Sequence, residues 1–369
     1  MRTTLVAAAA AVALAVVPRT IAGRGASKYL ARDVDTEDAL AREVAAYAAV
    51  DGPGFSLGST RFEGEWALVT YQMTILGLGQ MVLAHPELRD RYVPVMERAA
   101  TKMMMPVQRD FATEAWGTDG LAALGSMRGD AWLGWPALAL SMLRLVHPET
   151  PHAAVHDRIV EALARRLAAA PHGLIETYPG HSFPTDVAAC AAAVALYDRA
   201  TRADHSVMLR AWTQTYESAW VDSKSGYLWQ QGDWQTGDHR DAPRGSGTAV
   251  GAYFLSFVDE ALTAKLTDAL ARHERTVLGF GAIREYPGGV TGKGDIDSGP
   301  VILGVSIAAT GFTLGAARAT GRDALFVDLF RTVDLFGAPA SHGGGVRFAT
   351  GGPFGNAIML AQLTARGMR

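Results

Sequence analysis

The sequence predicts an all-helical fold in which about six helical hairpins form two concentric layers, an α/α toroid. Apolar residues recur three and four positions apart along most of the 369 residues, which is the spacing of one helix face. The first helix of each hairpin is nearly all apolar or small, as in 187–196, whereas the second carries charges, as in 161–166. Helices that are apolar all round are buried and amphipathic ones face solvent, so the first helices should form the inner layer.

The helices are expected in chain order, each inner helix followed by its outer partner. A helix at 35–50 completes the first hairpin, and the remaining ranges are 66–84 and 87–105, 130–146 and 151–170, 184–200 and 203–221, 247–258 and 260–277, 299–320 and 323–336, and 353–366. Sustained strand alternation is not expected, apart from short pieces such as 345–348.

The loops of the toroid should differ between its two ends. Inner-to-outer connections are short, as at 85–86 and 147–150, whereas outer-to-inner connections are long and rich in Gly, Pro, aromatic and acidic residues. Loops carry function when a rigid scaffold positions them. The long loops should therefore form a functional rim, where the inner helices also present their N-termini.

The composition is that of one globular domain with an ample core. The chain is 49% hydrophobic and 19% charged, its net charge is −3, and no linker divides residues 24–369. This charge balance gives no sign of nucleic-acid binding. We therefore expect a single toroidal domain that acts on a small molecule.

Residues 1–23 have the pattern of a secretory signal peptide or an N-terminal membrane anchor. Met1-Arg2-Thr3-Thr4 precedes a run without polar side chains at 5–17, and small residues follow at 20–22. The run is shorter than the roughly 20 residues that span a bilayer, which favours a signal peptide. The protein is accordingly expected to be extracytoplasmic, either secreted or periplasmic, or held at the membrane by an uncleaved anchor.

The single cysteine, Cys190, excludes an internal disulfide and a cysteine-based zinc site. It lies in an Ala-rich helix, where a small buried core residue is expected. No His pair has metal-ligand spacing on one helix face, so we predict no transition metal. A Ca²⁺ ion at Asp295 and Asp297 is left open, and no cofactor is predicted.

Four inner helices open with related acidic or small-residue signatures. They contain Arg128-Gly129-Asp130, then Pro184-Thr185-Asp186, then Arg244-Gly245-Ser246, and finally Asp295-Ile296-Asp297-Ser298-Gly299-Pro300. A single Asp at such a place can simply cap its helix. Capping needs one acid per helix, however, and the last signature supplies two.

These repeated acids indicate acid–base chemistry at the rim. Closely spaced carboxyls cannot all ionise cheaply, so at least one should hold a proton near neutral pH. A protonated acid beside an ionised one is the arrangement that acid–base catalysis requires. The catalytic candidates are Asp130, Asp186, Asp297 and the loop residue Glu176, while Glu285 occupies a second loop.

Aromatic residues in the same loops are candidates for substrate binding. Flat apolar faces suit sugar rings and terpenoid chains equally, although packing beneath long loops explains such residues as well. Arg128, Arg244 and Arg284 are expected to orient or tune the acids, and His181 is a candidate base. The substrate-binding candidates are Asp295, Trp116, Trp132, Tyr178, His181, Trp229, Trp234, Arg244, Tyr286 and Phe354, with Trp135 in the same loops.

Several short motifs give the chain a wider resemblance. In order they are His85-Pro86-Glu87-Leu88-Arg89, Trp116-Gly117-Thr118-Asp119, Gly173-Leu174-Ile175-Glu176, Tyr197-Asp198-Arg199, Arg210-Ala211-Trp212, Gly226-Tyr227-Leu228 and Asp295-Ile296-Asp297-Ser298-Gly299. By their order and spacing over about 66–336, the sequence resembles the linalool dehydratase/isomerase family. The resemblance implies an (α/α)6 barrel, a rim pocket and a homo-oligomer.

The resemblance does not extend to the family's catalytic side chains. Its histidine falls at Asp130, one active-site cysteine falls at Glu176, and the other falls at or beside Asp186. All three replacements are acids, which can still protonate a leaving hydroxyl or remove a proton.

Three functions are compatible with this sequence. The first is an enzyme that cleaves or forms a C–O bond of a hydroxylated substrate, a dehydratase or isomerase. The second is a glycoside hydrolase, in which the separation of two carboxyls sets the stereochemistry. The third is a non-catalytic toroid that binds ligand with its aromatic rim and uses the acids only as helix caps.

Overall fold

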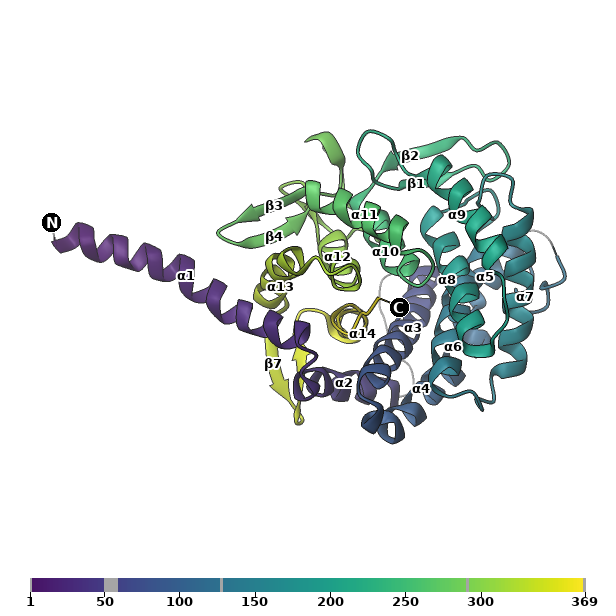
Figure 1. Cartoon of the computed structure of the whole chain (residues 1–369), viewed down its shortest axis with the longest axis horizontal. Coiled ribbons are helices and arrows are strands. Elements are labelled where there is room, and N and C mark those ends of the chain that lie inside the picture. The colour runs from purple at the N-terminus through teal and green to yellow at the C-terminus, as the bar shows by residue number, and fades with distance from the viewer. Residues whose placement is uncertain (1, 50–58, 127–128, 290–291, 368–369) are drawn as a thin grey trace.

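The computed structural model describes residues 2–49, 59–126, 129–289 and 292–367. This part of the chain is mostly helical (Figure 1), which confirms the predicted all-α class. The helices are α1 (Arg2–Leu30), α2 (Val34–Ala49), α3 (Thr60–Ala84), α4 (Arg89–Met103), α5 (Asp110–Trp116), α6 (Gly134–Val146), α7 (Ala153–Ala169), α8 (Pro184–Thr201), α9 (Ser206–Trp220), α10 (Gly245–Leu255), α11 (Glu260–Arg272), α12 (Ile307–Ala319), α13 (Asp323–Gly337) and α14 (Gly352–Leu363).

Four short antiparallel hairpins and four 3₁₀ turns connect the helices of the described part. The hairpins pair β1 (Trp229–Gly232) with β2 (His239–Pro243), β3 (Glu274–Val277) with β4 (Phe280–Ile283), β5 (Val301–Ile302) with β6 (Val305–Ser306), and β7 (Pro339–His342) with β8 (Gly345–Phe348). The 3₁₀ turns are η1 (Pro86–Leu88), η2 (Pro106–Gln108), η3 (Ala131–Leu133) and η4 (Pro287–Gly289).

The most deeply buried helices contact one another in chain order. Helix α3 packs against α6, α6 against α8, α8 against α10, α10 against α12, α12 against α14, and α14 against α3. Small residues permit this close approach, since a Cβ atom at Gly134 of α6 would lie 2.6 Å from the backbone nitrogen of Cys190 in α8. Cys190 is fully buried, as expected, and its Sγ donates to the carbonyl of Ala131 at 3.1 Å.

The amphipathic helices pack outside these buried ones. Helix α4 lies against α3 and α6, α7 against α6 and α8, α11 against α10 and α12, and α13 against α12. Each has a charged face, and α7 buries its apolar residues Ile159, Val160 and Leu163. The predicted contrast between apolar first helices and amphipathic second helices is therefore present in the structure.

Several predicted boundaries were wrong at the ends that carry the long loops. The helix expected at 299–320 begins only at Ile307, because the β5–β6 hairpin intervenes and Ser306 caps the helix by accepting from the Ala309 N–H at 3.1 Å. The helix expected at 260–277 ends at Arg272, where β3 follows. Helix α6 does not begin at Asp130, because Asp130 has φ 62°, a left-handed conformation that a right-handed helix cannot continue.

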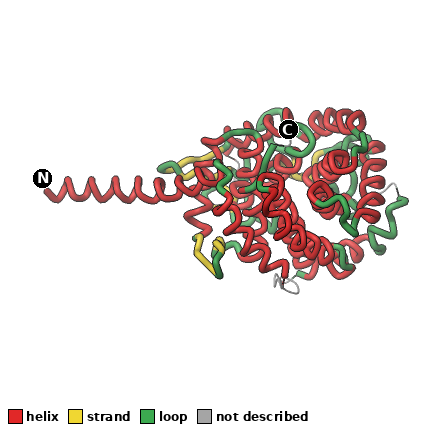
Figure 2. Tube along the Cα trace, turned by 60° about the horizontal axis from the view of Figure 1, so that its bottom comes forward, coloured by secondary structure: helices red, strands yellow, loops and turns green. Residues whose placement is uncertain are grey.

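Helix α1 projects from the rest of the molecule (Figures 1 and 2). Its last turns are attached to the body through contacts of α1 with α13 and α2. Ala22, Ala26 and Tyr29 are buried there, and the Tyr29 ring lies 5.5 Å from that of Phe330. Residues 2–23 of the predicted leader thus form one continuous helix with residues that pack on the body. Export or retention of the leader stays a prediction.

One described helix has the length and composition of a membrane span. This is Arg61–Ala84 within α3, but 83% of its apolar window is buried inside the protein. A core helix that is apolar all round has the same composition.

Candidate functional site

Asp186 lies in the first turn of α8 and is held by side chains from other elements. Its Oδ1 accepts from Trp135 Nε1 at 2.9 Å, and its Oδ2 accepts from Thr177 Oγ1 at 2.8 Å. The N-cap residue of α8 is Phe183, and no side chain caps this helix. Burial raises the pKa of Asp186 despite these two donors. Asp186 is therefore a positioned carboxyl and not a helix cap.

Glu65 lies near the start of α3, and the charge of Asp186 acts on its carboxyl. The Tyr178 hydroxyl donates a hydrogen bond to its Oε1, and the Arg61 guanidinium lies 4.2 Å from the centre of the Tyr178 ring. Burial, followed by the charges of Asp186 and Asp297, raises the pKa of Glu65 to about 7. Glu65 is thus poised to exchange a proton at neutral pH.

Asp297 belongs to a tight turn that precedes β5. Asp295 organises this turn, because its Oδ1 accepts from the backbone N–H groups of Asp297 at 3.1 Å and Ser298 at 2.9 Å. Asp297 is reached by solvent, yet surrounding protein displaces much of the bulk water around its carboxyl. This burial, with the charges of Asp295 and Asp186, raises its pKa to about 6.

Glu65, Asp186 and Asp297 together form what we call the carboxylate cluster. They come from α3, α8 and the loop before β5, yet each of Glu65 and Asp297 has its pKa raised by the charge of Asp186. Three carboxyls that repel one another cannot all be ionised near neutral pH. The cluster therefore holds at least one proton together with at least one negative charge.

Arg244 ties the Asp297 turn to the body of the protein. Its Nε donates to Glu285 Oε1 at 2.7 Å, and its Nη1 forms an ion pair with Asp295. Glu285 is fully buried and also accepts from Ser246 Oγ at 2.7 Å. The predicted residues Arg244 and Asp295 thus form an ion pair that holds the turn. The centre of the Tyr286 ring lies 5.4 Å from the Arg244 guanidinium carbon.

Asp130 has its own set of electrostatic neighbours, Arg166 and Asp119. It is buried, and burial raises its pKa to about 6, with Arg166 opposing and Asp119 adding to the effect. Neither Asp186 nor Asp297 contributes to this shift. The left-handed backbone of Asp130 lies in the segment that Arg166 spans through the carbonyls of Ser126 and Gly129. Its predicted role beside Asp186 and Asp297 stays a prediction.

Glu176 closes its own loop. One carboxylate oxygen accepts from the Gly180 N–H at 2.8 Å, and its carbonyl accepts from the Ala131 N–H at 2.8 Å. It is buried. This geometry gives Glu176 a structural contact that positions Thr177 and Tyr178, both of which bind acids of the cluster.

The predicted aromatic residues divide into two groups. Tyr178 and Trp135 bind the cluster directly, and Phe354 stacks at 4.4 Å on Trp66, the neighbour of Glu65. The remaining predicted aromatic residues have other contacts. Trp116 donates to the Thr177 carbonyl and Tyr286 to the Lys293 carbonyl, whereas Trp132 packs on Phe111, Trp229 stacks on His239 and Trp234 packs on the core. Of the predicted polar residues, His181 forms a hydrogen bond with Gln231, and the Arg284 carbonyl accepts from Tyr227. Arg128 lies outside the described residues.

Glu65 is the site residue that the sequence reasoning missed. The expected helix began at 66, whereas α3 begins at Thr60 and places Arg61 and Glu65 in its first turns. The available signal was the contrast between these charges and the uncharged stretch that follows them in α3.

Metal chemistry gains no support from the arrangement of ligands. Within the described residues, no three or more His, Cys, Asp and Glu side chains are grouped so that they could hold a metal ion. Asp295 is instead committed to Arg244 and to its own turn.

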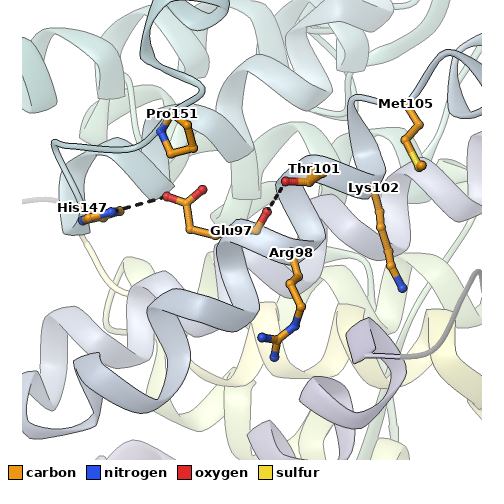
Figure 3. A pocket seen from close by; sticks show the side chains of 7 residues that line it. All are labelled: Glu97, Arg98, Thr101, Lys102, Met105, His147 and Pro151. Carbon is orange, nitrogen blue, oxygen red and sulfur yellow. Dashed lines mark hydrogen bonds and ion pairs between the residues drawn. The ribbon is translucent and has the colours of Figure 1, made fainter.

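A separate surface groove lies along α4 (Figure 3), and no residue of the carboxylate cluster lines it. It is lined by Glu97, Arg98, Thr101, Lys102, Met105, His147 and Pro151. Glu97 approaches His147 at 3.6 Å and His152 at 3.7 Å. None of the acids predicted from the sequence lines this groove.

Comparison of the chain with protein-family models and with curated proteins finds no match. The resemblance to the linalool dehydratase/isomerase family stays a prediction.

Proposed function

We propose that this protein is an acid–base enzyme that cleaves or forms a C–O bond of a small hydroxylated molecule. The observation that carries the proposal is Glu65, whose pKa of about 7 is raised by burial and by two neighbouring carboxylates. A group that binds its proton near neutral pH, beside ionised acids, can both donate and accept a proton in one cycle.

The proposal includes an (α/α)6 barrel as the scaffold. The six buried helices α3, α6, α8, α10, α12 and α14 contact one another in sequence, with α14 returning to α3. Glu65 and Asp186 lie near the N-termini of two of these helices, and the Asp297 loop leads to a third. In such a barrel these three positions share one rim, as the long loops of the sequence suggested.

In the proposed reaction, Glu65 gives its proton to the leaving oxygen as the C–O bond breaks toward that oxygen, which departs as water. Ionised Asp297 takes a proton from the adjacent carbon, and the C–H electron pair becomes the new C=C bond. Asp186, fixed by Trp135 and Thr177, stabilises positive charge that develops on carbon. The reverse sequence hydrates the alkene, and both directions together isomerise an alcohol.

The exposure of Asp297 to solvent supports glycoside hydrolysis as a second candidate. In that reaction Asp297 activates a water molecule instead of removing a proton from carbon, while Glu65 still protonates the leaving oxygen. The two reactions use the same acid and differ in the proton that Asp297 removes, which comes from carbon in the first and from water in the second.

The test is turnover of a panel of terpene alcohols and a panel of glycans by the full chain and its variants. Alkene formation indicates the hydro-lyase, and release of reducing ends indicates the hydrolase. Asp186→Asn should lower kcat by about 10²-fold or more, because removal of a positioned catalytic carboxylate has effects of this size. Asp157→Asn, on the outer helix α7, is the matched control and should keep full activity.

Two results would contradict the proposal. If Asp130→Asn abolishes turnover while Asp186→Asn retains it, the chemistry belongs to the Asp130 side. If the wild-type chain binds a panel member and converts none, the protein is a binding toroid.

A further inference from the structure

Two neighbouring hairpins of this protein turn at the same unusual dipeptide. The β3–β4 hairpin turns at Leu278-Gly279 and the β5–β6 hairpin at Leu303-Gly304, each between paired residues, Val277 with Phe280 and Ile302 with Val305. All four turn residues have positive φ, 53° and 80° in the first hairpin and 53° and 82° in the second. Positive φ at both central positions defines a type I′ turn.

Leucine is disfavoured at the first position of a type I′ turn. Its branched side chain strains a left-handed backbone, which Asn, Asp and Gly adopt more readily. Burial offers no compensation, because Leu278 is 63% exposed and Leu303 is 85% exposed. Folding alone would therefore favour Asn at both positions, and a strained residue without a folding benefit points to a role outside the fold.

The two hairpins adjoin, because the β5–β6 tip lies beside the open end of the β3–β4 hairpin, where the Glu285 N–H donates to the Gly304 carbonyl at 3.1 Å. We call the exposed apolar residues Val277, Leu278, Ile302 and Leu303 of these hairpins the hairpin face. The Arg275 guanidinium in β3 donates to the Leu303 carbonyl at 3.0 Å, and Arg284 after β4 forms a bridge with Val305 in β6. Val277 and Ile302 are also exposed, at 69% and 59%. Four large apolar side chains on two adjoining hairpins are thus exposed to solvent.

Helix α1 lies against the β3–β4 turn of the hairpin face. The Arg19 side chain packs on Gly279, where an added Cβ would lie 2.6 Å from its Nε, and Arg331 donates to the Gly279 carbonyl at 3.1 Å. Nearby in α1, Val16, Val17 and Ile21 are exposed. In Figure 1 the β3–β4 tip points to the side from which α1 projects.

The charge of α1 identifies the partner surface. Residues 2–30 contain four basic residues, Arg2, Arg19, Arg24 and Lys28, and no acidic residue, although the whole chain has a net charge of −3. A cationic, apolar helix is suited to an anionic lipid surface. Its uncharged run at 5–17 corresponds to about 20 Å of helix, which is less than the hydrocarbon thickness of about 30 Å.

We infer that the hairpin face docks onto an anionic lipid bilayer, with α1 inserted beside it. Because the uncharged run of α1 is too short to cross the hydrocarbon region, α1 holds the body of the protein at the membrane surface. Leu278 and Leu303 then enter the interface, where burial of their side chains offsets the cost of their strained turns. The β5–β6 hairpin directly follows the Asp297 turn, so this docking also places the carboxylate cluster's loop beside the bilayer.

The test is flotation of the full chain with vesicles of 70:30 phosphatidylcholine and phosphatidylglycerol, at a lipid concentration that binds half of the wild type. The double variant Leu278→Asn/Leu303→Asn should lower the partition coefficient by about tenfold or more, because two apolar side chains are lost from the interface. Its Tm should equal or exceed that of the wild type, because Asn suits both turns. Val207→Asn, at a residue 72% exposed on α9, is the matched control and should bind as the wild type does.

Two results would overturn the inference. The first is a wild-type chain that does not float with these vesicles. The second is a double variant that floats as well as the wild type; if that variant also has a smaller mass by light scattering, the hairpin face belongs to a contact between copies of the chain.

Discussion

Replacing Glu65 with Gln should make the protein more stable at alkaline pH while it removes activity. Gln keeps an oxygen that can accept from the Tyr178 hydroxyl, but it carries no charge. In the folded protein, burial and then the charges of Asp186 and Asp297 raise the pKa of Glu65 from 4.5 to about 7. The ionised form of Glu65 is therefore destabilised in the folded protein, and the uncharged Gln avoids this penalty.

The size and sign follow from proton linkage. A tenfold change in proton affinity is worth about 1.4 kcal/mol, so a pKa of about 7 against 4.5 corresponds to at most about 3.4 kcal/mol. Glu65 is still partly accessible to solvent, which reduces the expected effect to about 1–2 kcal/mol. Because the pKa of Glu65 is higher in the folded than in the unfolded protein, the wild type has this extra free energy of unfolding below pH 4.5 and loses it as pH rises through about 7.

The assay is urea unfolding of wild type and Glu65→Gln at pH 4.5 and pH 8, with the exposed Glu161→Gln on α7 as control. The difference in free energy of unfolding between variant and wild type should be about 1–2 kcal/mol more favourable to the variant at pH 8 than at pH 4.5. The kcat of the variant should fall by about 10²-fold or more. A difference between variant and wild type that is the same at both pH values would refute the reasoning. So would a variant that is less stable than the wild type at pH 8.

Two further predictions concern pH dependence and packing. The rate should depend on pH as a bell-shaped curve, rising as Asp297 ionises near pH 6 and falling as Glu65 loses its proton near pH 7. Asp295→Asn removes a charge that raises the pKa of Asp297, so the rising part of the curve should move about 0.5–1 pH unit lower when turnover is measured against pH. An unchanged rising part would exclude Asp297 as the base. Gly134→Ala should cost about 1–3 kcal/mol in urea unfolding, because its Cβ would lie 2.6 Å from the Cys190 nitrogen. Gly355→Ala in α14, where nothing lies within 4 Å, should be neutral or stabilising by up to about 1 kcal/mol, and equal losses in both variants would contradict the packing argument.

The sequence by itself determined the helical class and the division of helices into buried and solvent-facing members. Both follow from local spacing of apolar residues, since a face pattern such as that of α7 is set by residues three and four apart. The acidic character of the loops was also readable, and it led to Asp186 and Asp297. Whether these acids serve a reaction stays a prediction.

Only the tertiary structure decided which acids meet. Asp130 and Asp186 occupy similar places before or within inner helices, but the positive φ of Asp130 places it with Arg166, whereas Asp186 is held by Trp135 and Thr177. Glu65 joins them because α3 extends past its apolar run to Thr60. Proton affinity depends on desolvation and on charges brought close by packing, and these distances between remote chain segments are not encoded in any local pattern.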